Sequence, residues 1–210
     1  MEPLEFVGLI ASRIFHDFAG PIGAIVNGTE LLADEPDPNV RREFTSILGG
    51  AANQLAARLR IYRLIFGTGD LADFVAIDDA RAALTDWLLA ETRVMLDWLI
   101  PHDRLSRGIA KLVLGLAVLG VEALPRGGTL TVTSLGQTWT VKATGVRAAL
   151  TADVLAALND SPGVEIGSRG ALARYVQAVA ERSNLVVSIR SDERTVVLTV
   201  ADRGMSSLPR

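Results

Sequence analysis

The 210-residue chain has the length of one large domain or two small ones, which is enough to enclose a hydrophobic core. Apolar residues make up 49% of it and charged residues 21%, which indicates a globular protein and excludes a mainly disordered one. Its 21 basic and 24 acidic side chains give a net charge of −3, so no excess of positive charge favours nucleic acid as a partner. Cysteine is absent, which excludes disulfides, thiolate metal sites and a cysteine nucleophile.

The sequence shows no pattern typical of secretion or of membrane insertion. The residues that follow Met1 are amphipathic and not continuously apolar, unlike a signal peptide. The longest apolar run, residues 112–121, contains ten residues and is too short to cross a bilayer. We therefore expect a cytoplasmic protein without a membrane partner.

Two long helices are predicted at the start of the chain, over residues 3–34 and 38–66. In both, apolar residues recur at three- and four-residue spacing, as on one face of an amphipathic helix. In the first helix this stripe consists of Leu4, Val7, Ala11, Ile14, Phe18, Ile22, Ile25 and Leu32. Pro36 and Pro38 forbid a continuous helix, so we expect a short turn and an antiparallel hairpin.

Such a hairpin cannot bury all of its apolar surface alone. Beside the main stripe, Phe6, Ile10, Ile61 and Phe66 also require cover. Two hairpins related by a two-fold axis form a four-helix bundle, so the pattern predicts a homodimer. The alternative is that the second half of the chain folds back over the hairpin.

His16, one of the two histidines, is predicted on the outer face of the first helix. It stands two residues from both Ile14 and Phe18, which turns it about 200° away from the apolar stripe. Its neighbours on the outer face are all small, namely Ser12, Ala19, Gly20 and Gly23. Glycine and proline destabilise a helix interior by roughly 1 and 3 kcal/mol relative to alanine, so this composition favours a role other than helix stability. The alternative is an ordinary surface histidine.

The segment of residues 67–70 contains two glycines and is the predicted boundary between domains 1–68 and 69–210. Beyond it the pattern predicts helices over 77–99, 105–124, 151–159 and 171–182, and strands over 129–134, 138–143, 185–190 and 195–201. Two helices, two strands, two helices and two strands in this order predict an α+β domain. Its helices should cover one face of a mainly antiparallel sheet.

Residues 16–25 read His-Asp-Phe-Ala-Gly-Pro-Ile-Gly-Ala-Ile. This stretch resembles the phosphoacceptor box of bacterial sensor histidine kinases, His-Glu/Asp-Leu-Arg-Thr/Asn-Pro-Leu-Thr-Ala-Ile. The residues in register are His16, Asp17, Phe18, Pro21 and the pair Ala24-Ile25. The resemblance implies that His16 carries a phosphoryl group.

Residues 111–130 resemble the N-box helix and the following strand in the ATP-binding domain of the same kinases. The kinases have two asparagines four residues apart in this helix, and the second holds Mg²⁺ on the nucleotide. Gly115 and Leu119 stand in these places, and neither offers the oxygen ligand that Mg²⁺ requires. Ala143 begins the closest match to the adenine-binding box and replaces its aspartate. We therefore expect an α/β sandwich of the kinase type without a usable ATP site, without a cofactor and without a metal.

The whole chain is similar to the ChpT-type histidine phosphotransferases of alphaproteobacterial phosphorelays. The resemblance implies that His16 accepts a phosphoryl group from the receiver aspartate of a hybrid histidine kinase. It then passes the group to the aspartate of a response regulator, typically one that governs the cell cycle. The receiver domain supplies Mg²⁺, so the phosphotransferase has only to present the imidazole ring.

The site residues have separate expected roles. The resemblance implies that Asp17 accepts a hydrogen bond from one ring nitrogen of His16 and so sets the tautomer. Arg13, one turn earlier on the same helix, is expected to attract the acidic pocket of the receiver. Gly20 and Gly23 are expected to let the partner approach closely. Asp17 and Arg13 also have plainer interpretations, as a solvated helix acid and an exposed arginine.

Two other functions remain open from the sequence. A weakly active histidine kinase would need the ATP chemistry that Leu119 and Ala143 argue against. A non-catalytic dimeric scaffold or anti-kinase that binds receiver domains would not need an outward-facing histidine with an adjacent acid.

Overall fold

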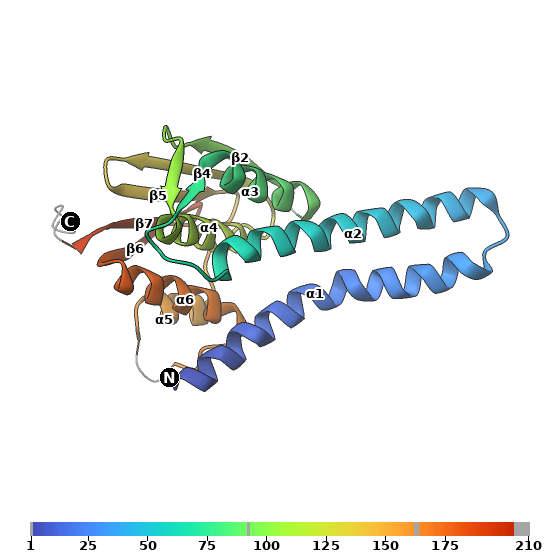
Figure 1. Ribbon diagram of the computed structural model, residues 1–210, viewed down its shortest axis with the longest axis horizontal. Coiled ribbons are helices and arrows are strands. Elements are labelled where there is room, and N and C mark those ends of the chain that lie inside the picture. The colour runs from blue at the N-terminus through green and yellow to red at the C-terminus, as the bar shows by residue number, and fades with distance from the viewer. Residues whose placement is uncertain (1, 92, 162–163, 204–210) are drawn as a thin grey trace.

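The computed structural model describes residues 2–91, 93–161 and 164–203. A long hairpin of two helices, α1 (Pro3–Asp34) and α2 (Pro38–Phe66), extends from a compact body formed by the rest of the chain (Figure 1). Both helices begin and end where the sequence predicts. The predicted boundary between residues 68 and 69 lies in the connection that follows α2. Residue 1 and residues 204–210, at the outer ends of the two predicted domains, lie outside the described residues.

Local hydrogen bonds close the tip of the hairpin. The carboxylate of Asp37 accepts a hydrogen bond of 2.7 Å from the amide of Asn39 and so caps α2. The Arg41 guanidinium donates to the carbonyls of Leu32 and Glu35 at 3.2 and 3.1 Å. These bonds satisfy carbonyls that the end of α1 leaves without helical partners. The turn is therefore determined by residues within the turn itself.

Two residues set the path of α1. Pro21 stands inside the helix and has no amide hydrogen, so the carbonyl one turn earlier loses its helical partner. The helix bends along its length, as expected for an internal proline (Figure 1). Farther on, Gly28 lets α1 and α2 approach closely, because a Cβ atom there would lie 2.7 Å from a methyl carbon of Leu48.

The body is an α+β sandwich. Its elements are β1 (Phe74–Ala76), α3 (Ile77–Glu91), β2 (Val94–Leu99), β3 (Arg104–Ser106), α4 (Arg107–Glu122), β4 (Gly128–Leu135), β5 (Thr138–Thr144), α5 (Ala152–Leu158), α6 (Ser168–Arg182), β6 (Leu185–Ser191) and β7 (Thr195–Asp202). Among the described residues, five strands form a sheet in the order β2-β4-β5-β7-β6. All neighbours in it are antiparallel except β2 and β4, so the predicted fold class is confirmed.

The helices cover one face of this sheet. Alternate residues of the central strands, such as Leu130, Val132, Val141 and Leu198, are buried on that face. Helices α3, α4 and α6 pack against the strands, and α5 packs on α6. Helix α4 is buried almost all round, as its continuous apolar sequence predicts.

The prediction of one helix over residues 77–99 is wrong. Helix α3 ends at Glu91, and Val94–Leu99 is strand β2. This strand pairs in parallel with β4, so that Val94 lies opposite Gly128 and Leu99 opposite Thr133. Because the pairing partner is far along the chain, local periodicity gives no sign of it.

The helix predicted over residues 105–124 also begins differently. Arg104–Ser106 forms the short strand β3, which pairs with β1, and α4 begins at Arg107. The Ser106 hydroxyl accepts a hydrogen bond of 3.3 Å from the amide of Ile109 and caps the helix. Strand β3 and helix α4 are therefore joined without a loop.

Lys111 joins the base of the hairpin to the body. It lies inside the fold on α4, with only 4% of its surface exposed. Its ammonium group donates to the carbonyls of Ile65 and Gly67 at 2.8 and 2.5 Å, and lies 3.0 Å from the hydroxyl of Tyr175. The Tyr175 hydroxyl itself donates to the Ile65 carbonyl at 2.8 Å. The carboxyl end of α2 is thus bound by a cation from α4 and a hydroxyl from α6.

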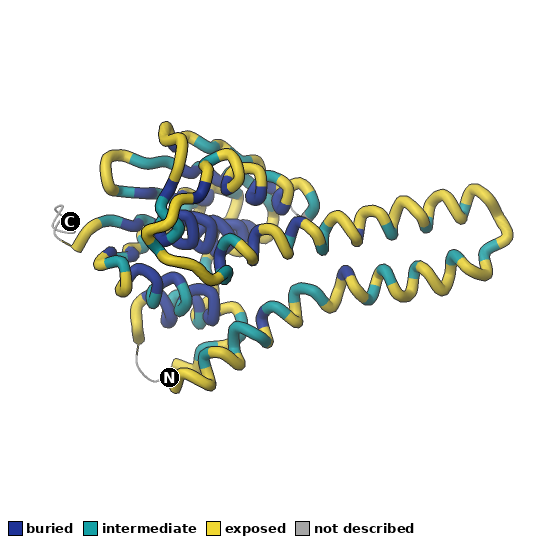
Figure 2. Tube along the Cα trace, viewed as in Figure 1, coloured by how far each residue is buried: buried dark blue, intermediate teal, exposed yellow. Residues whose placement is uncertain are grey.

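The far half of the hairpin is largely exposed, whereas the buried residues gather in the body and at the hairpin base (Figure 2). Within the described residues, α1 is the single helix whose length and composition would allow it to cross a membrane. One such helix near the N-terminus is weak support for a membrane span. The apolar surface of α1 also fits the bundle that the sequence predicts.

Candidate functional site

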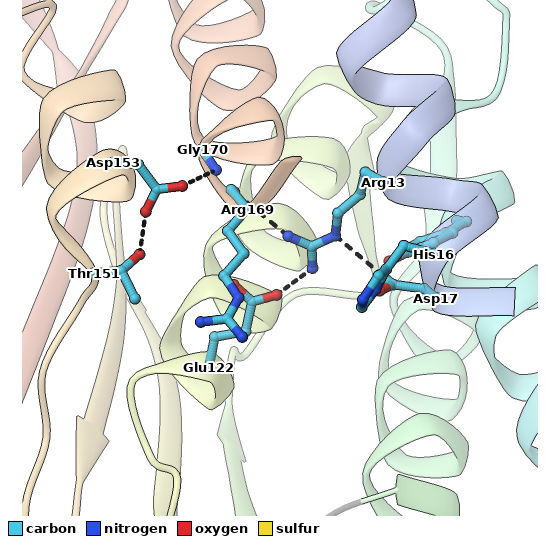
Figure 3. Close-up of polar contacts among 9 residues, drawn as sticks. Arg13, His16, Asp17, Glu122, Thr151, Asp153, Arg169 and Gly170 are labelled. Atoms are coloured by element: carbon cyan, nitrogen blue, oxygen red, sulfur yellow. Dashed lines mark hydrogen bonds and ion pairs between the residues drawn. The ribbon is translucent and has the colours of Figure 1, made fainter. Parts of the chain in front are cut away.

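His16 lies on the outward face of α1, where its spacing predicts it. Its side chain is 81% exposed. The ring atom Nδ1 lies 3.2 Å from Oδ1 of Asp17 (Figure 3). The rest of the ring is open to an incoming partner.

Two hydrogen-bond donors hold Asp17 by the carboxylate oxygen that does not face His16. Its Oδ2 accepts a hydrogen bond of 3.0 Å from Nε of Arg13 and a second from the hydroxyl of Tyr62 on α2. The carboxylate is largely covered, with 21% of the side chain exposed. Because two donors fix Oδ2, Oδ1 is the oxygen that faces the imidazole ring.

These contacts determine the charge of Asp17 and the tautomer of His16. Burial alone would raise the pKa of Asp17, but the Arg13 guanidinium and the hydrogen bonds from Tyr62, His16 and Arg13 outweigh it and lower the pKa below its usual value. The carboxylate is therefore ionised at neutral pH and can only accept hydrogen bonds. The hydrogen on His16 accordingly belongs on Nδ1, which leaves the lone pair of Nε2 available for attack.

Arg13 is not placed as the sequence analysis expects. The sequence predicts an exposed guanidinium, but Arg13 is only 5% exposed because α6 packs against this side of α1 and the Glu122 side chain of α4 reaches it. Its guanidinium pairs with Asp17 and with the carboxylate of Glu122 on α4, and lies 3.4 Å from the carbonyl of Arg169. Burial alone would lower the pKa of Arg13, but Glu122, Tyr62 and Asp17 raise it above its ordinary value, so the group stays charged. Its placement is that of an internal support for Asp17.

A hollow of about 370 Å³ lies beside His16, between α1 and the body. It is lined by Arg13, His16, Asp17, Glu122, Pro125, Leu150, Thr151, Val154, Ser168 and Arg169. The side chain of Arg169, in the first turn of α6, lies close to the carboxylate of Glu122 (Figure 3). The body thus forms one wall of the site, and the site combines residues from both halves of the chain.

Gly20 and Gly23 leave free space on α1 near His16. A Cβ atom at either position would meet no atom of this chain within 4 Å. Packing within the chain therefore does not require glycine here, although each glycine weakens the helix by about 1 kcal/mol relative to alanine. The open space fits the prediction that a partner approaches this face.

Gly115, Leu119 and Ala143, which the sequence resemblance places at the kinase nucleotide site, lie in the apolar core. Leu119 is fully buried and Ala143 is 1% exposed. A Cβ atom on Gly115 would lie 2.6 Å from a methyl carbon of Val176, so α6 closes against α4 there. Across the described residues, no group of three or more His, Cys, Asp or Glu side chains is arranged to hold a metal ion.

Sequence reasoning missed three residues of this site: Tyr62, Glu122 and Arg169. Tyr62 fits the apolar stripe of α2, and Glu122 ends the most apolar helix of the chain. The contact of Tyr62 with Asp17 spans 45 positions and that of Glu122 with Arg13 spans 109. The one available signal was a tyrosine hydroxyl at a stripe position, since a buried hydroxyl needs a hydrogen-bond partner.

Comparison with known proteins gives consistent results. Residues 77–195 match the family model of the histidine phosphotransferase C-terminal domain. The protein phosphotransferase ChpT of Brucella abortus (strain 2308) is 33% identical over 134 residues, which are 63% of this chain and 62% of that protein. The match thus spans less than two thirds of the relative's length.

A solved structure also resembles the whole chain. A bacterial phosphotransferase is 25% identical, with a TM-score of 0.84. The likeness covers 95% of this chain and 97% of the other. It includes the hairpin as well as the body, whereas the family model covers the body alone.

Proposed function

Because the chain belongs to the histidine phosphotransferase family, we propose that His16 carries a phosphoryl group between two aspartates of a phosphorelay. It accepts the group from the receiver domain of a hybrid histidine kinase and passes it to a response regulator. The observation that carries the proposal is the exposed imidazole whose Nδ1 faces the ionised Asp17. A solvated surface histidine needs no such partner.

The transfer follows from the geometry of the ring. The Nε2 lone pair attacks the phosphorus atom of the receiver's aspartyl phosphate, the bond from phosphorus to the carboxylate oxygen breaks, and the free carboxylate leaves. The hydrogen on Nδ1 stays there and is donated to Oδ1 of Asp17. The negative charge of Asp17 stabilises the positive charge that develops on the ring. Return of the phosphoryl group to a second aspartate is the same step in reverse.

The remaining requirements of phosphoryl transfer are positioning and neutralisation of charge. In our proposal the receiver domain supplies Mg²⁺, and this chain binds neither a metal nor ATP. The support is that apolar packing occupies the positions of Gly115, Leu119 and Ala143. Receivers of such relays are cytoplasmic, so we propose a cytoplasmic protein.

We further propose a homodimer in which two hairpins form a four-helix bundle. Several large apolar side chains are exposed along one face of α1, namely Leu4, Val7, Phe15, Ile22 and Val26. They recur at helical spacing, and the body of the same chain leaves them exposed. A second copy offers the same apolar face in a closed two-fold arrangement.

Substitution of Val26 by glutamate should convert the dimer into monomers, because it places a charge in the proposed bundle core. Val26 is 50% exposed within one chain, so the folded monomer should tolerate the change. Light scattering should show twice the 22.4 kDa chain mass for the wild type and the single mass for the variant. Asn27→Glu is the control. It adds the same charge at the next position of α1, which lies outside this apolar face, so this variant should remain a dimer. A monomeric wild type at micromolar concentration would exclude the bundle.

The function is tested with a receiver domain that carries a radiolabelled phosphoryl group. Wild-type protein should take up acid-labile label in the presence of Mg²⁺ and release it onto a response regulator, whereas His16→Ala should take up none. ATP in place of the phosphorylated receiver should label neither protein. Label from ATP would favour a weak kinase, and binding of the receiver without uptake of label would favour a scaffold.

A further inference from the structure

Tyr62 lies where it can control the orientation of Asp17. Its ring is buried between α1 and α2, 5.9 Å from the ring of Phe18 in a stacked arrangement and 5.4 Å from that of Phe66 edge to face. The ring is therefore fixed by packing, and its hydroxyl donates to Oδ2 of Asp17. A fixed donor of this kind restricts the carboxylate to one rotamer.

Arg13 restrains the same oxygen and is itself restrained by the body. Glu122 on α4 pairs with its guanidinium, and the Arg169 carbonyl on α6 accepts from it at 3.4 Å. The series of contacts thus runs from the body through Arg13 to Asp17 and ends at His16 (Figure 3). His16 is mostly exposed, and its contact with Asp17 ties it to this rigid framework.

We propose that Tyr62 and Glu122 are positioning residues for His16, Tyr62 acting through Asp17 and Glu122 acting through Arg13 and Asp17. The inference rests on the phosphotransfer proposed above for its kinetic consequences. Together the two residues hold Oδ1 of Asp17 towards Nδ1, so that the lone pair of Nε2 is presented in one direction. A preformed orientation lowers the barrier because it need not be found during the encounter with the receiver.

This inference gives the body a role that needs no nucleotide. Glu122 ends α4, and the Arg169 carbonyl belongs to the first turn of α6. Both elements must be in place for Arg13 to be bound on two sides. The body then serves as the support that fixes the phosphoacceptor, in addition to forming a wall of the hollow beside it.

The tautomer of His16 provides a direct readout. The chain has two histidines, so ¹⁵N-labelled histidine gives two sets of ring signals, and His16→Ala identifies those of residue 16. In the wild type, His16 should show hydrogen on Nδ1 and an unprotonated Nε2 at slightly alkaline pH. In Tyr62→Phe and in Glu122→Gln the signals should shift towards hydrogen on Nε2, the form that imidazole prefers in water.

The kinetics should separate positioning from binding. Tyr62→Phe and Glu122→Gln should lower the first-order rate constant for uptake of the phosphoryl group about three- to tenfold, less than the full effect of losing one hydrogen bond to a charged group, because both residues act on His16 through Asp17. The receiver concentration for half-maximal rate should not change. A rise in that concentration at unchanged rate constant would overturn the proposal, because it would place the two residues in partner binding.

Matched variants control for loss of stability. Tyr175→Phe removes a hydroxyl from the same aromatic cluster, where the rings of Phe66 and Tyr175 lie 4.9 Å apart, but this hydroxyl donates to Ile65 and not to the site. Asp86→Asn removes the acid of the exposed pair with Arg60, as a control for Glu122→Gln. Neither control should alter the His16 tautomer.

Two results from the tautomer measurements would also overturn the inference. One is a His16 tautomer that is the same in the wild type, Tyr62→Phe and Glu122→Gln. The other is an equal shift in Tyr175→Phe, which would assign the effect to general loosening of the fold. If instead the wild type accepts no label while the tautomer responds as expected, the proposed function fails and the positioning of His16 by these residues stands.

Discussion

Replacement of Asp17 by asparagine should slow phosphoryl transfer through His16 about a hundredfold, at the lower end of the range for loss of a group that orients a catalytic histidine. Asparagine keeps the size of the side chain but removes the charge that stabilises the ring as it becomes positive. Its amide can also donate to Nδ1, which favours the tautomer in which Nε2 carries the hydrogen and cannot attack. Rapid-quench measurement of label transfer from a phosphorylated receiver domain gives the rate constant directly.

The fold should tolerate this change, because Arg13 keeps its pair with Glu122 and the Tyr62 hydroxyl can still donate to the amide oxygen. The pH dependence of stability provides a control. The pKa of Asp17 is lowered in the folded state, so its ionisation contributes stability above the ordinary value of 3.8, and this contribution is lost as the pH falls through the folded-state value. Asp17→Asn should remove that part of the acid sensitivity. If Asp17→Asn transfers label as fast as the wild type, the carboxylate has no role in orienting the ring.

Local signals in the sequence predict the hairpin well. The bounds of α1 and α2 agree with the predicted ranges because Pro36, Pro38 and the capping residue Asp37 act within their own turn. The outward direction of His16 follows from helical geometry alone. Both features depend on residues only a few positions apart, which sequence patterns describe directly.

Features that depend on distant residues are the ones that the sequence pattern misses. The sequence of strand β2 reads as the end of a helix. Its parallel partner β4 lies beyond α4, so nothing in the neighbouring residues indicates the pairing. Arg13 occupies the side of α1 opposite to the apolar stripe, which indicates exposure, but α6 packs against that side and Glu122 of α4 pairs with the guanidinium. An amphipathic pattern shows which face is apolar and does not show that a second surface will cover the polar face. The contacts of Tyr62 and Glu122 with the site are missed for a similar reason, because their partners are far away in the sequence.

Replacement of Lys111 by methionine should lower the free energy of unfolding by about 3 kcal/mol, the sum of partly compensated losses at three polar partners. Methionine fills nearly the same volume but leaves the carbonyls of Ile65 and Gly67 and the hydroxyl of Tyr175 without the ammonium donor. Part of this loss is offset, because the variant no longer has to bury a charged group away from water. Denaturation by urea, followed by circular dichroism, gives the change.

The charge on Lys111 predicts an additional effect of pH. Burial lowers the pKa of this lysine below its usual 10.5, and the nearby Arg107 lowers it further. Between the folded and unfolded values the unfolded chain binds more protons, so the wild type should gain stability as the pH rises through this interval. Lys111→Met should lose this gain together with the stability at neutral pH.

The chain contains a matched control for this substitution. Lys142 is exposed on β5, so Lys142→Met should leave the free energy of unfolding within about 0.5 kcal/mol of the wild type. Equal losses in the two variants would show that Lys111 contributes no more than a surface lysine. A loss confined to Lys111→Met, with slower phosphoryl uptake by the protein that remains folded, is the expected result. The slower uptake is expected because the hairpin that carries His16 is bound to the body at this lysine.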